Sequence, residues 1–404
     1  MKYLYLAVEV SVRDLDSRLL LALFALKQGY TTIVGEDHFF TRNLSNLPAG
    51  VFFDKSFTKN HWKKHFQAAK KSGCNIVGID EEGGNSLEGI SGHWKRYFQN
   101  SMKVVSRVFT WGQFQHNKVV GIHPKFASKV VKTGSQRWDL LRPEGVNFYS
   151  DKAGRIRAEY GDFILVNLNA VVDRTGRIPL CKYELHSLDA LFGLVHGLSD
   201  KCPGTKIVLR PHPKEVVKDL ADKFKDCPNV VLRNDDVVEI WALASKLTVV
   251  TGCTTGIQAY LMNSPVVSYA LPSFQESFLT NLLCPTVQTV EEIADRFERS
   301  RAGDLDWFSR GRANKLELAR QHFEALDGPF ACQNMLAQIN KVAVGGKKLK
   351  LGKLNLKSAI SPKFPDPGFP EVQRRLERLR DCYSLNVDFR ASQIRSRVYL
   401  IEGI

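Results

Sequence analysis

A cationic loop directly follows an apolar run in residues 206–214. The segment is KIVLRPHPK, so a predicted strand ends in Arg-Pro-His-Pro-Lys. The prolines fix the backbone on both sides of His212, while Arg210 and Lys214 supply positive charge. A stiff, positive loop suits a phosphate or a carboxylate. The competing interpretation is a proline-rich strand-to-helix turn with incidental charges.

A second anion site is predicted in residues 247–269, LTVVTGCTTGIQAYLMNSPVVSY. The pattern indicates a strand, a turn of small residues, a helix and another strand. Gly252 permits close backbone approach, and Thr254 and Thr255 fall at the helix N-terminus, where backbone N–H groups attract anions. We expect a phosphate at this turn. An N-cap role alone for either threonine is the alternative.

Carboxylates follow predicted strands at two further places. The turn Asp80-Glu81-Glu82-Gly83-Gly84 comes directly after the apolar run 75–79. Glu81 or Glu82 would suit a general base that takes a proton from a hydroxyl group; a solvated acidic turn is the alternative. Glu9 and Arg13, at the end of the first predicted strand, form another candidate pair, which either binds a ligand or caps the following helix.

The elements that must position these residues form two series. Short apolar runs alternate with helical stretches, which predicts α/β domains with doubly wound parallel sheets. We expect an N-terminal Rossmann-like domain over 1–150, a C-terminal domain over 151–344 that ends in a return helix at 307–340, and a basic linker and tail over 345–404. A further short amphipathic helix is predicted at 370–381.

Ligands bind outside the carboxyl ends of the strands in doubly wound sheets, so we expect both domains to face one cleft. The expected strands are 3–8, 31–34, 75–79, 108–110, 130–133, 163–166, 206–209, 230–232, 247–250 and 266–269.

Charge and composition narrow the classes of partner. The 404-residue chain has a formal net charge of +15, so we expect an anionic partner: nucleic acid, an acidic membrane surface or a charged sugar. Seven lysines and no acidic residue occur in 341–363, which suits either a linker resting on an anionic bilayer or an ordinary solvated tail. No apolar run approaches the roughly 18 residues of a membrane span, and the N-terminus predicts a strand rather than a signal peptide. Eight scattered cysteines without a CxxC pair fit reduced thiols in the cytoplasm.

The order of several segments carries a resemblance to a known family. The chain resembles GT-B glycosyltransferases of bacterial surface-polysaccharide assembly, most nearly the surface-carbohydrate biosynthesis proteins related to retaining β-Kdo transferases (glycosyltransferase family 99 and its capsule-linkage relatives). The resemblance covers most of residues 1–340. Its segments are AVEVSVRDLDSRLLLALFALKQGY (7–30), GIDEEGG (78–84), FTWG (109–112), KTGSQRWDLLRPE (132–144), DFILVNLN (162–169), RPHPK (210–214), TGCTTG (251–256) and ALDGP (325–329).

This resemblance implies a GT-B fold, a CMP-activated ulosonic acid donor such as Kdo, a glycan or glycolipid acceptor, and no metal or other cofactor. A monophosphate leaving group carries less charge than a diphosphate, so a helix N-terminus with Arg or Lys can stabilise it without Mg²⁺. Asp173 is a candidate nucleophile for a retaining double displacement. Arg137 joins Glu9 and Arg13 as a candidate for binding the acceptor or the donor carboxylate. Gln258 stands where many GT-B enzymes place a Glu that holds the donor ribose.

Three classes of function therefore remain open. The first is a cytoplasmic glycosyltransferase, peripheral at the inner membrane. The second is a GT-B-fold enzyme of another kind, either a nucleotide-sugar epimerase or a polyol-phosphate transferase. The third is a basic binding protein without catalysis. The interleaved aromatic and basic residues of an RNA-binding face are missing from the sequence, so we expect no nucleic-acid partner.

Overall fold

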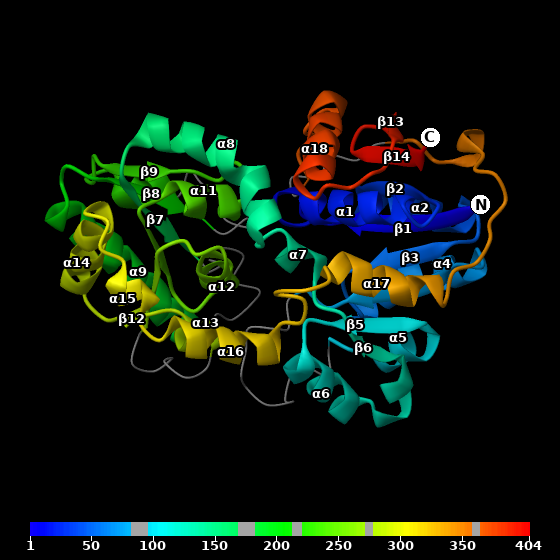
Figure 1. The fold of residues 1–404 in the computed structure, drawn as a ribbon, viewed down its shortest axis with the longest axis horizontal. Helices are drawn as coiled ribbons and strands as arrows, with labels where there is room; N and C mark the ends of the chain where they lie inside the picture. The colour runs from blue at the N-terminus through cyan, green and yellow to red at the C-terminus, as the bar shows by residue number, and fades with distance from the viewer. Residues whose placement is uncertain (82–95, 169–181, 212–219, 271–277, 358–363) are drawn as a thin grey trace. The chain divides into compact units, whose positions relative to one another are not determined.

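The computed structural model describes residues 1–81, 96–168, 182–211, 220–270, 278–357 and 364–404, with backbone alone for 182–189. The described chain forms two compact units, which Figure 1 shows as ribbons. Unit 1 runs from Met1 to Phe148 and from Ala319 to Ile404, and unit 2 runs from Tyr149 to Leu318.

The sheet of unit 1 has the strand order β13-β14-β2-β1-β3-β4-β5-β6. The strands from β2 to β6 are parallel, whereas β14 pairs antiparallel with β2 and with β13. The order therefore reverses between β1 and β3, which makes that pair the topological switch point. The strands are β1 (Lys2–Val8), β2 (Tyr30–Glu36), β3 (Val51–Asp54), β4 (Asn75–Ile79), β5 (Arg107–Thr110), β6 (Val130–Lys132), β13 (Phe389–Arg395) and β14 (Val398–Gly403).

Helices and helical turns accompany this sheet. A continuous helical segment follows β3 and contains a π-helical turn, Trp62–Phe66, between α3 and α4. The helices of unit 1 are α1 (Ser11–Leu26), α2 (Asp37–Asn43), α3 (Lys59–His61), α4 (Gln67–Lys71), α5 (Gln99–Val104), α6 (Gln113–Ile122), α7 (Gln136–Asp139), α17 (Ala331–Asn340) and α18 (Phe369–Cys382).

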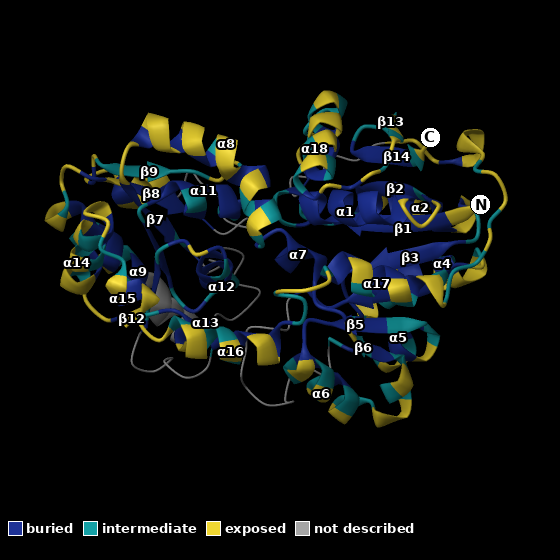
Figure 2. Ribbon diagram, in the orientation of Figure 1, coloured by how far each residue is buried: buried dark blue, intermediate teal, exposed yellow. Residues whose placement is uncertain are grey.

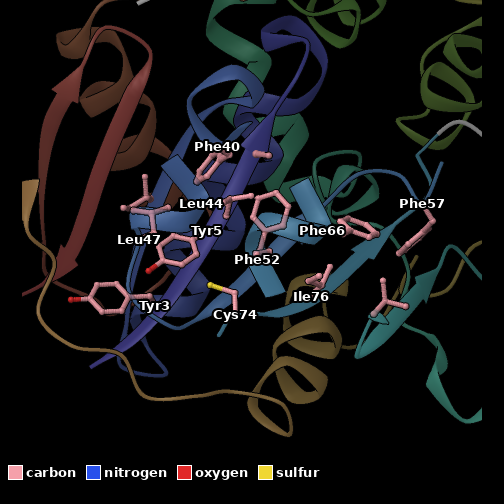
Figure 3. Packing of buried hydrophobic residues seen from close by; sticks show 14 of the residues in the cluster. Tyr3, Tyr5, Phe40, Leu44, Leu47, Phe52, Phe57, Phe66, Cys74 and Ile76 are labelled. Atoms are coloured by element: carbon pink, nitrogen blue, oxygen red, sulfur yellow. The ribbon is translucent and has the colours of Figure 1, made fainter. Parts of the chain in front are cut away.

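Aromatic and aliphatic side chains fill the core on one face of this sheet, where Figure 3 shows Phe40, Phe52 and Phe66 close together. Phe40 and Phe52 have ring centroids 5.6 Å apart. The strands of both sheets are largely buried, as the dark blue arrows in Figure 2 show. The side chains of β1 and β3 are largely buried. In open parallel sheets, ligands bind just beyond the carboxyl ends of such strands.

The C-terminal residues differ from the expected basic tail. Helix α18 packs Val372, Leu376 and Leu379 inside unit 1, and β13 and β14 extend the first sheet. The lysine-rich stretch before them also contacts unit 1, because the Gly346 N–H donates to the Met1 carbonyl at 2.9 Å. The sequence analysis predicted α18 but overlooked the hairpin, whose first strand alternates charged and apolar residues too weakly to stand out.

The helix expected over 307–340 is also three helices rather than one. These are α15 (Asp306–Ser309), α16 (Arg312–His322) and α17. Gly311 lies between the first two with φ +70°, and Gly328 precedes α17 with φ +66°. Both conformations lie in the left-handed region that glycine adopts readily and that ends helices.

Unit 2 contains a six-stranded parallel sheet in the order β12-β11-β10-β7-β8-β9. Counted within the unit this is the order 3-2-1-4-5-6 of dinucleotide-binding folds, with its switch point between β7 and β10. The strands are β7 (Phe163–Asn167), β8 (Lys206–Arg210), β9 (Val230–Leu232), β10 (Leu247–Val250), β11 (Val266–Tyr269) and β12 (Thr286–Val287). The remaining helices are α8 (Pro143–Tyr160), which begins in unit 1, α9 (Lys182–Lys201), α11 (Val238–Ala244), α12 (Thr254–Leu261), α13 (Leu279–Leu283) and α14 (Val290–Arg301).

The two parallel sheets confirm the predicted fold class, and the strands expected from sequence lie within a few residues of observed ones. Strands β3 and β12 were missed. Among the helices of the described residues, none is long and apolar enough to cross a membrane.

Candidate functional site

Residues from two neighbouring strands meet at the switch point of unit 2. Asn167 ends β7, and its Nδ2 donates a hydrogen bond to Thr255 Oγ1, 3.2 Å away, on the helix that follows β10. Asn167 Nδ2 also lies 3.6 Å from the sulfur of Cys253. This is the place where open parallel sheets bind their ligands.

The turn into α12 is built for close backbone approach. Gly252 has φ +68°, and a Cβ there would lie 2.8 Å from the ring of Phe278, so a larger residue is excluded. Its N–H donates to Ser268 Oγ at 3.3 Å, which holds the turn against β11. Cys253, the residue before the helix, makes no side-chain cap hydrogen bond to the described residues. The Gly256 N–H donates to the Cys253 carbonyl at 3.1 Å, so the N–H groups of Thr254 and Thr255 are the donors of the first turn that suit an anion.

Arg210 has a structural task that the sequence analysis did not foresee. Its guanidinium donates to the carbonyls of Asp235 (2.6 Å) and Asp236 (2.9 Å), and it lies over the ring of Trp241. Burial lowers the pKa of Arg210 to about 10, so it remains charged at neutral pH. Arg210 thus holds the loop after β9 in place; its predicted contact with a phosphate stays a prediction.

Gln258 is buried on α12, and its Nε2 donates to the carboxylate of Glu239 on α11. This contact joins α11 to α12, the helix that follows β10. Glu239 was not among the predicted site residues. The predicted contact of Gln258 with a ribose is not tested by this arrangement.

The switch point of unit 1 carries two ion pairs. Glu9, after β1, pairs with Lys55, which directly follows β3. Arg13 pairs instead with Asp14 at 2.7 Å, and Asp14 Oδ2 accepts the Val10 N–H at the start of α1. Glu9 and Arg13 are therefore each held by another partner, and Asp14 caps the helix.

Neighbouring cations favour the ionised form of the Asp14 carboxyl group. Burial opposes ionisation of the carboxyl, yet the guanidinium of Arg13 and the ammonium of Lys55 hold its pKa well below the ordinary value. Lys55 was missed because the strand that positions it, VFFD, was not predicted. The signal was present, since the three-residue apolar run Val51-Phe52-Phe53 ended in the charged pair Asp54-Lys55.

Glu81 is held beneath the next strand end. Its Oε1 accepts hydrogen bonds from Arg18 (2.8 Å) and Gln136 (2.9 Å), and all three side chains are buried. Its Oε2 has no partner among the described residues. Arg18 also lies over the ring of Phe53, 4.4 Å from its centroid. Glu81 is therefore fixed in orientation, and its Oε2 remains able to accept a hydrogen bond.

Arg137 lies on α7, next to Gln136, whose side chain donates to Glu81. Its backbone N–H donates to Ser135 Oγ at 3.3 Å, and its guanidinium lies 5.7 Å from the ring centroid of Trp138. The Nε of Arg137 has no partner among the described residues, and the side chain is largely buried. A buried cation in this state is able to take a ligand carboxylate.

Four of the predicted site residues lie outside the described residues: Glu82, Asp173, His212 and Lys214. The others fall into two groups, one at the carboxyl edge of each sheet. Gly252, Thr254, Thr255, Gln258 and Arg210 belong to unit 2, and Glu9, Arg13, Glu81 and Arg137 belong to unit 1.

A scan against protein-family models finds no match to the sequence, and a search of curated proteins finds none either. Solved structures match the fold. A structure of the wall teichoic acid polymerase TagF covers 84% of this chain and 88% of its own at 12% identity, with a TM-score of 0.52. An S. aureus MnaA–UDP co-structure covers 84% and 96% at 14% identity, with a TM-score of 0.54.

A putative UDP-N-acetylglucosamine 2-epimerase from Listeria monocytogenes matches over 84% of this chain and 96% of its own, at 12% identity and a TM-score of 0.53. At identities this low, the matches show a shared fold and nothing about function. The chain has the two-domain, Rossmann-like GT-B fold.

Proposed function

We propose that the chain is a glycosyltransferase that binds a nucleotide-activated sugar at the carboxyl edge of unit 2. The observation that carries the proposal is the turn at Gly252, where the first N–H groups of α12 lie at the switch point beside Asn167 and Thr255. These donors suit a phosphate. A fold shared with a protein that has been solved with UDP supports a nucleotide as the ligand.

We propose further that the donor is a CMP-activated ulosonic acid of the Kdo type and that the product is a bacterial surface polysaccharide or glycolipid. The resemblance of the sequence motifs supports this donor. The net charge of +15 agrees with it, since such a donor brings both a phosphate and a carboxylate. In this proposal the α12 N-terminus stabilises the leaving phosphate without a metal ion.

Acid–base chemistry is assigned to the acidic turn of unit 1. The proposed general base is Glu81 or Glu82, and Glu81 already has one oxygen fixed by Arg18 and Gln136. Asp173 is the proposed nucleophile of a retaining reaction. Arg137 is proposed to bind the carboxylate of the donor or the acceptor.

The experiment is incubation with CMP-Kdo, with and without a glycan acceptor, followed by measurement of released CMP. Release that depends on acceptor, together with a new acceptor product, is the expected result. Hydrolysis at the same rate without acceptor, or no turnover, would count against transfer from this donor.

A second enzyme class has support from the MnaA and Listeria structures, one solved with UDP and the other described as a 2-epimerase. An epimerase needs no acceptor. Incubation with UDP-N-acetylglucosamine alone, followed by NMR of the product, would reveal inversion at C2. The structural likeness to TagF, a wall teichoic acid polymerase, supports the polyol-phosphate transferase alternative in the same way.

We also propose peripheral contact with an anionic membrane through the lysine-rich segment 347–357. Leu351 and Leu356 are 47% and 45% exposed there, among exposed lysines. Apolar side chains flanked by lysines suit the headgroup region of an anionic bilayer. Binding to phosphatidylglycerol vesicles that weakens in Leu351→Ser/Leu356→Ser supports this contact, and equal binding by both proteins refutes it.

A further inference from the structure

A histidine–aspartate cluster lies on the face of the unit 1 sheet that α2, α3 and α4 cover. Asp54 ends β3 and is fully buried. Its Oδ1 contacts His61 Nδ1 at 2.7 Å, and its Oδ2 contacts His65 Nδ1 at 2.8 Å. One carboxylate therefore orients both imidazole rings.

The ring of His65 directs its second nitrogen toward a third acid, Asp37. His65 Nε2 lies 3.2 Å from Asp37 Oδ1 and 3.1 Å from Thr41 Oγ1. Potential ligand atoms of Asp37, His61 and His65 all lie within 4.8 Å of one another. A first-row divalent ion has ligand distances near 2.0–2.2 Å, so it fits among atoms with this spacing.

The local backbone accounts for the spacing of the two histidines. His61 ends α3 and His65 lies in the π-helical turn that follows. Residues four apart on a helical segment share one face, and π-helical turns are often found at functional sites. The ring of His65 packs against Phe52, 5.4 Å between centroids, which locks it in place.

We propose that Asp37, His61 and His65 bind a divalent transition-metal ion of the zinc type, with Asp54 as the residue that positions both imidazoles. Two imidazoles and one carboxylate are a usual ligand set for Zn²⁺, with the fourth position left to water or a substrate oxygen. Ligand histidines commonly donate their second nitrogen to a carboxylate, as both do here to Asp54.

The surrounding charges permit this ion. The Asp54 carboxyl group lies against both imidazoles and adds an acidic group beside the ion. Lys64 Nζ lies 3.9 Å from Asp37 Oδ2, and its side chain is 45% exposed. It can move into solvent when an ion takes its place. The proposal does not depend on the glycosyltransferase assignment.

The test is isothermal titration of tag-free, chelator-treated protein with Zn²⁺ alone. His61→Asn and His65→Asn are the informative variants, because the asparagine amide replaces Nδ1 and its hydrogen bond to Asp54 while Nε2 is lost. Asp37→Asn removes the third ligand. His38→Asn is the matched control, because His38 neighbours Asp37 but is exposed.

Wild type and His38→Asn are expected to bind one more Zn²⁺ per chain than the three ligand variants. Asp54→Asn, verified as folded by circular dichroism, is expected to weaken that site by about 10–100-fold. Equal Zn²⁺ binding by wild type and His61→Asn, or no binding by wild type, would overturn the proposal and leave the cluster as a clamp between helix and sheet.

Discussion

The buried pair Arg18–Glu81 fixes the proposed general base inside unit 1. Neither side chain is more than 1% exposed, and Arg18 Nε also donates to the Ala7 carbonyl at 3.2 Å. Loss of one partner would leave the other charge buried without compensation, which is costly. Any loss of activity on mutation of Glu81 must therefore be separated from loss of fold.

We predict that Glu81→Gln lowers the free energy of unfolding by about 3–5 kcal/mol. Urea denaturation checks this value. The double variant Arg18→Met/Glu81→Gln should recover part of the loss, because no uncompensated charge is left. Asp304→Asn, which removes the exposed ion pair with Arg299, is the control and should change little. A Glu81→Gln protein as stable as wild type would show that the pair contributes nothing.

Gly252 is the residue whose replacement tests the unit 2 turn. Gly252→Ala places a side chain in the left-handed region and against Phe278, so stability should fall by about 1–2 kcal/mol. Nucleotide binding, measured by titration calorimetry, should weaken as the α12 N-terminus shifts.

Gly204→Ala is the matched control, since an added Cβ there meets no atom within 4 Å. Unchanged stability and nucleotide affinity in Gly252→Ala would contradict the tight-turn interpretation.

Sequence patterns predicted the turn at Gly252 but not the partners that come from other strands. Thr255 and Gly252 stand in one continuous motif, so local spacing identified them. The contacts of Asn167 with Thr255 and of Asp54 with His61 join segments that come together only when the sheet forms. Strand order determines such pairs, and residue spacing along the chain carries no direct signal of it.

At the scale of elements, three of the sequence motifs serve packing. FTWG, KTGSQRWD and the segment before ALDGP bring together Trp111, Trp138 and Phe323, with ring centroids 5.0 and 5.1 Å from Trp138 to the other two. Asp139, at the end of α7, accepts the backbone N–H groups of Ala331 and Cys332, each at 2.8 Å. It therefore caps α17 from a segment almost two hundred residues earlier.

Asp139 should make the stability of unit 1 depend on pH. Burial raises the pKa of its carboxyl to about 7, although the N–H groups of Cys332 and Ala331 oppose this. The folded state thus holds a proton that the unfolded chain releases near pH 4. Stabilisation by this proton is complete below about pH 4 and falls by about 1.4 kcal/mol per unit as the pH rises toward 7.

In Asp139→Asn this pH-dependent contribution disappears, and a buried N–H loses its acceptor at a cost of about 1–3 kcal/mol. Urea unfolding of both proteins from pH 5 to pH 8 measures the difference. The gap between wild type and variant should narrow as the pH rises. A gap that stays constant over this range would contradict the raised pKa.

At the scale of the whole molecule, residues 364–404 are part of unit 1 rather than an appendage. Leu376 on α18 is fully buried, and β14 pairs with β2. We predict that Leu376→Ala destabilises the protein by about 2–5 kcal/mol, because it leaves a cavity. Leu351→Ala, at a 47% exposed position, should stay within about 0.5 kcal/mol of wild type. Thermal unfolding compares the two, and equal effects would refute this integration.

The overall architecture was predictable because parallel strands buried on both faces give continuous apolar runs. The ten apolar and β-branched runs that alternate with helices in the two series predicted the α/β class and most strands. The edge hairpin β13–β14 was not predictable in this way. Strand β13 is partly exposed and mixed in composition, and the pairing of β14 with β2 depends on contacts between distant parts of the sequence.

The central claim, a nucleotide site at the unit 2 switch point, is tested most directly by a thermal-shift screen of wild type and Asn167→Ala. Wild type should be stabilised by CMP or CTP more than by UDP, GDP and TDP, and Asn167→Ala should lose most of that shift. Stabilisation by UDP alone would overturn the cytidine donor. No shift with any nucleotide, or equal shifts in both proteins, would contradict the site itself.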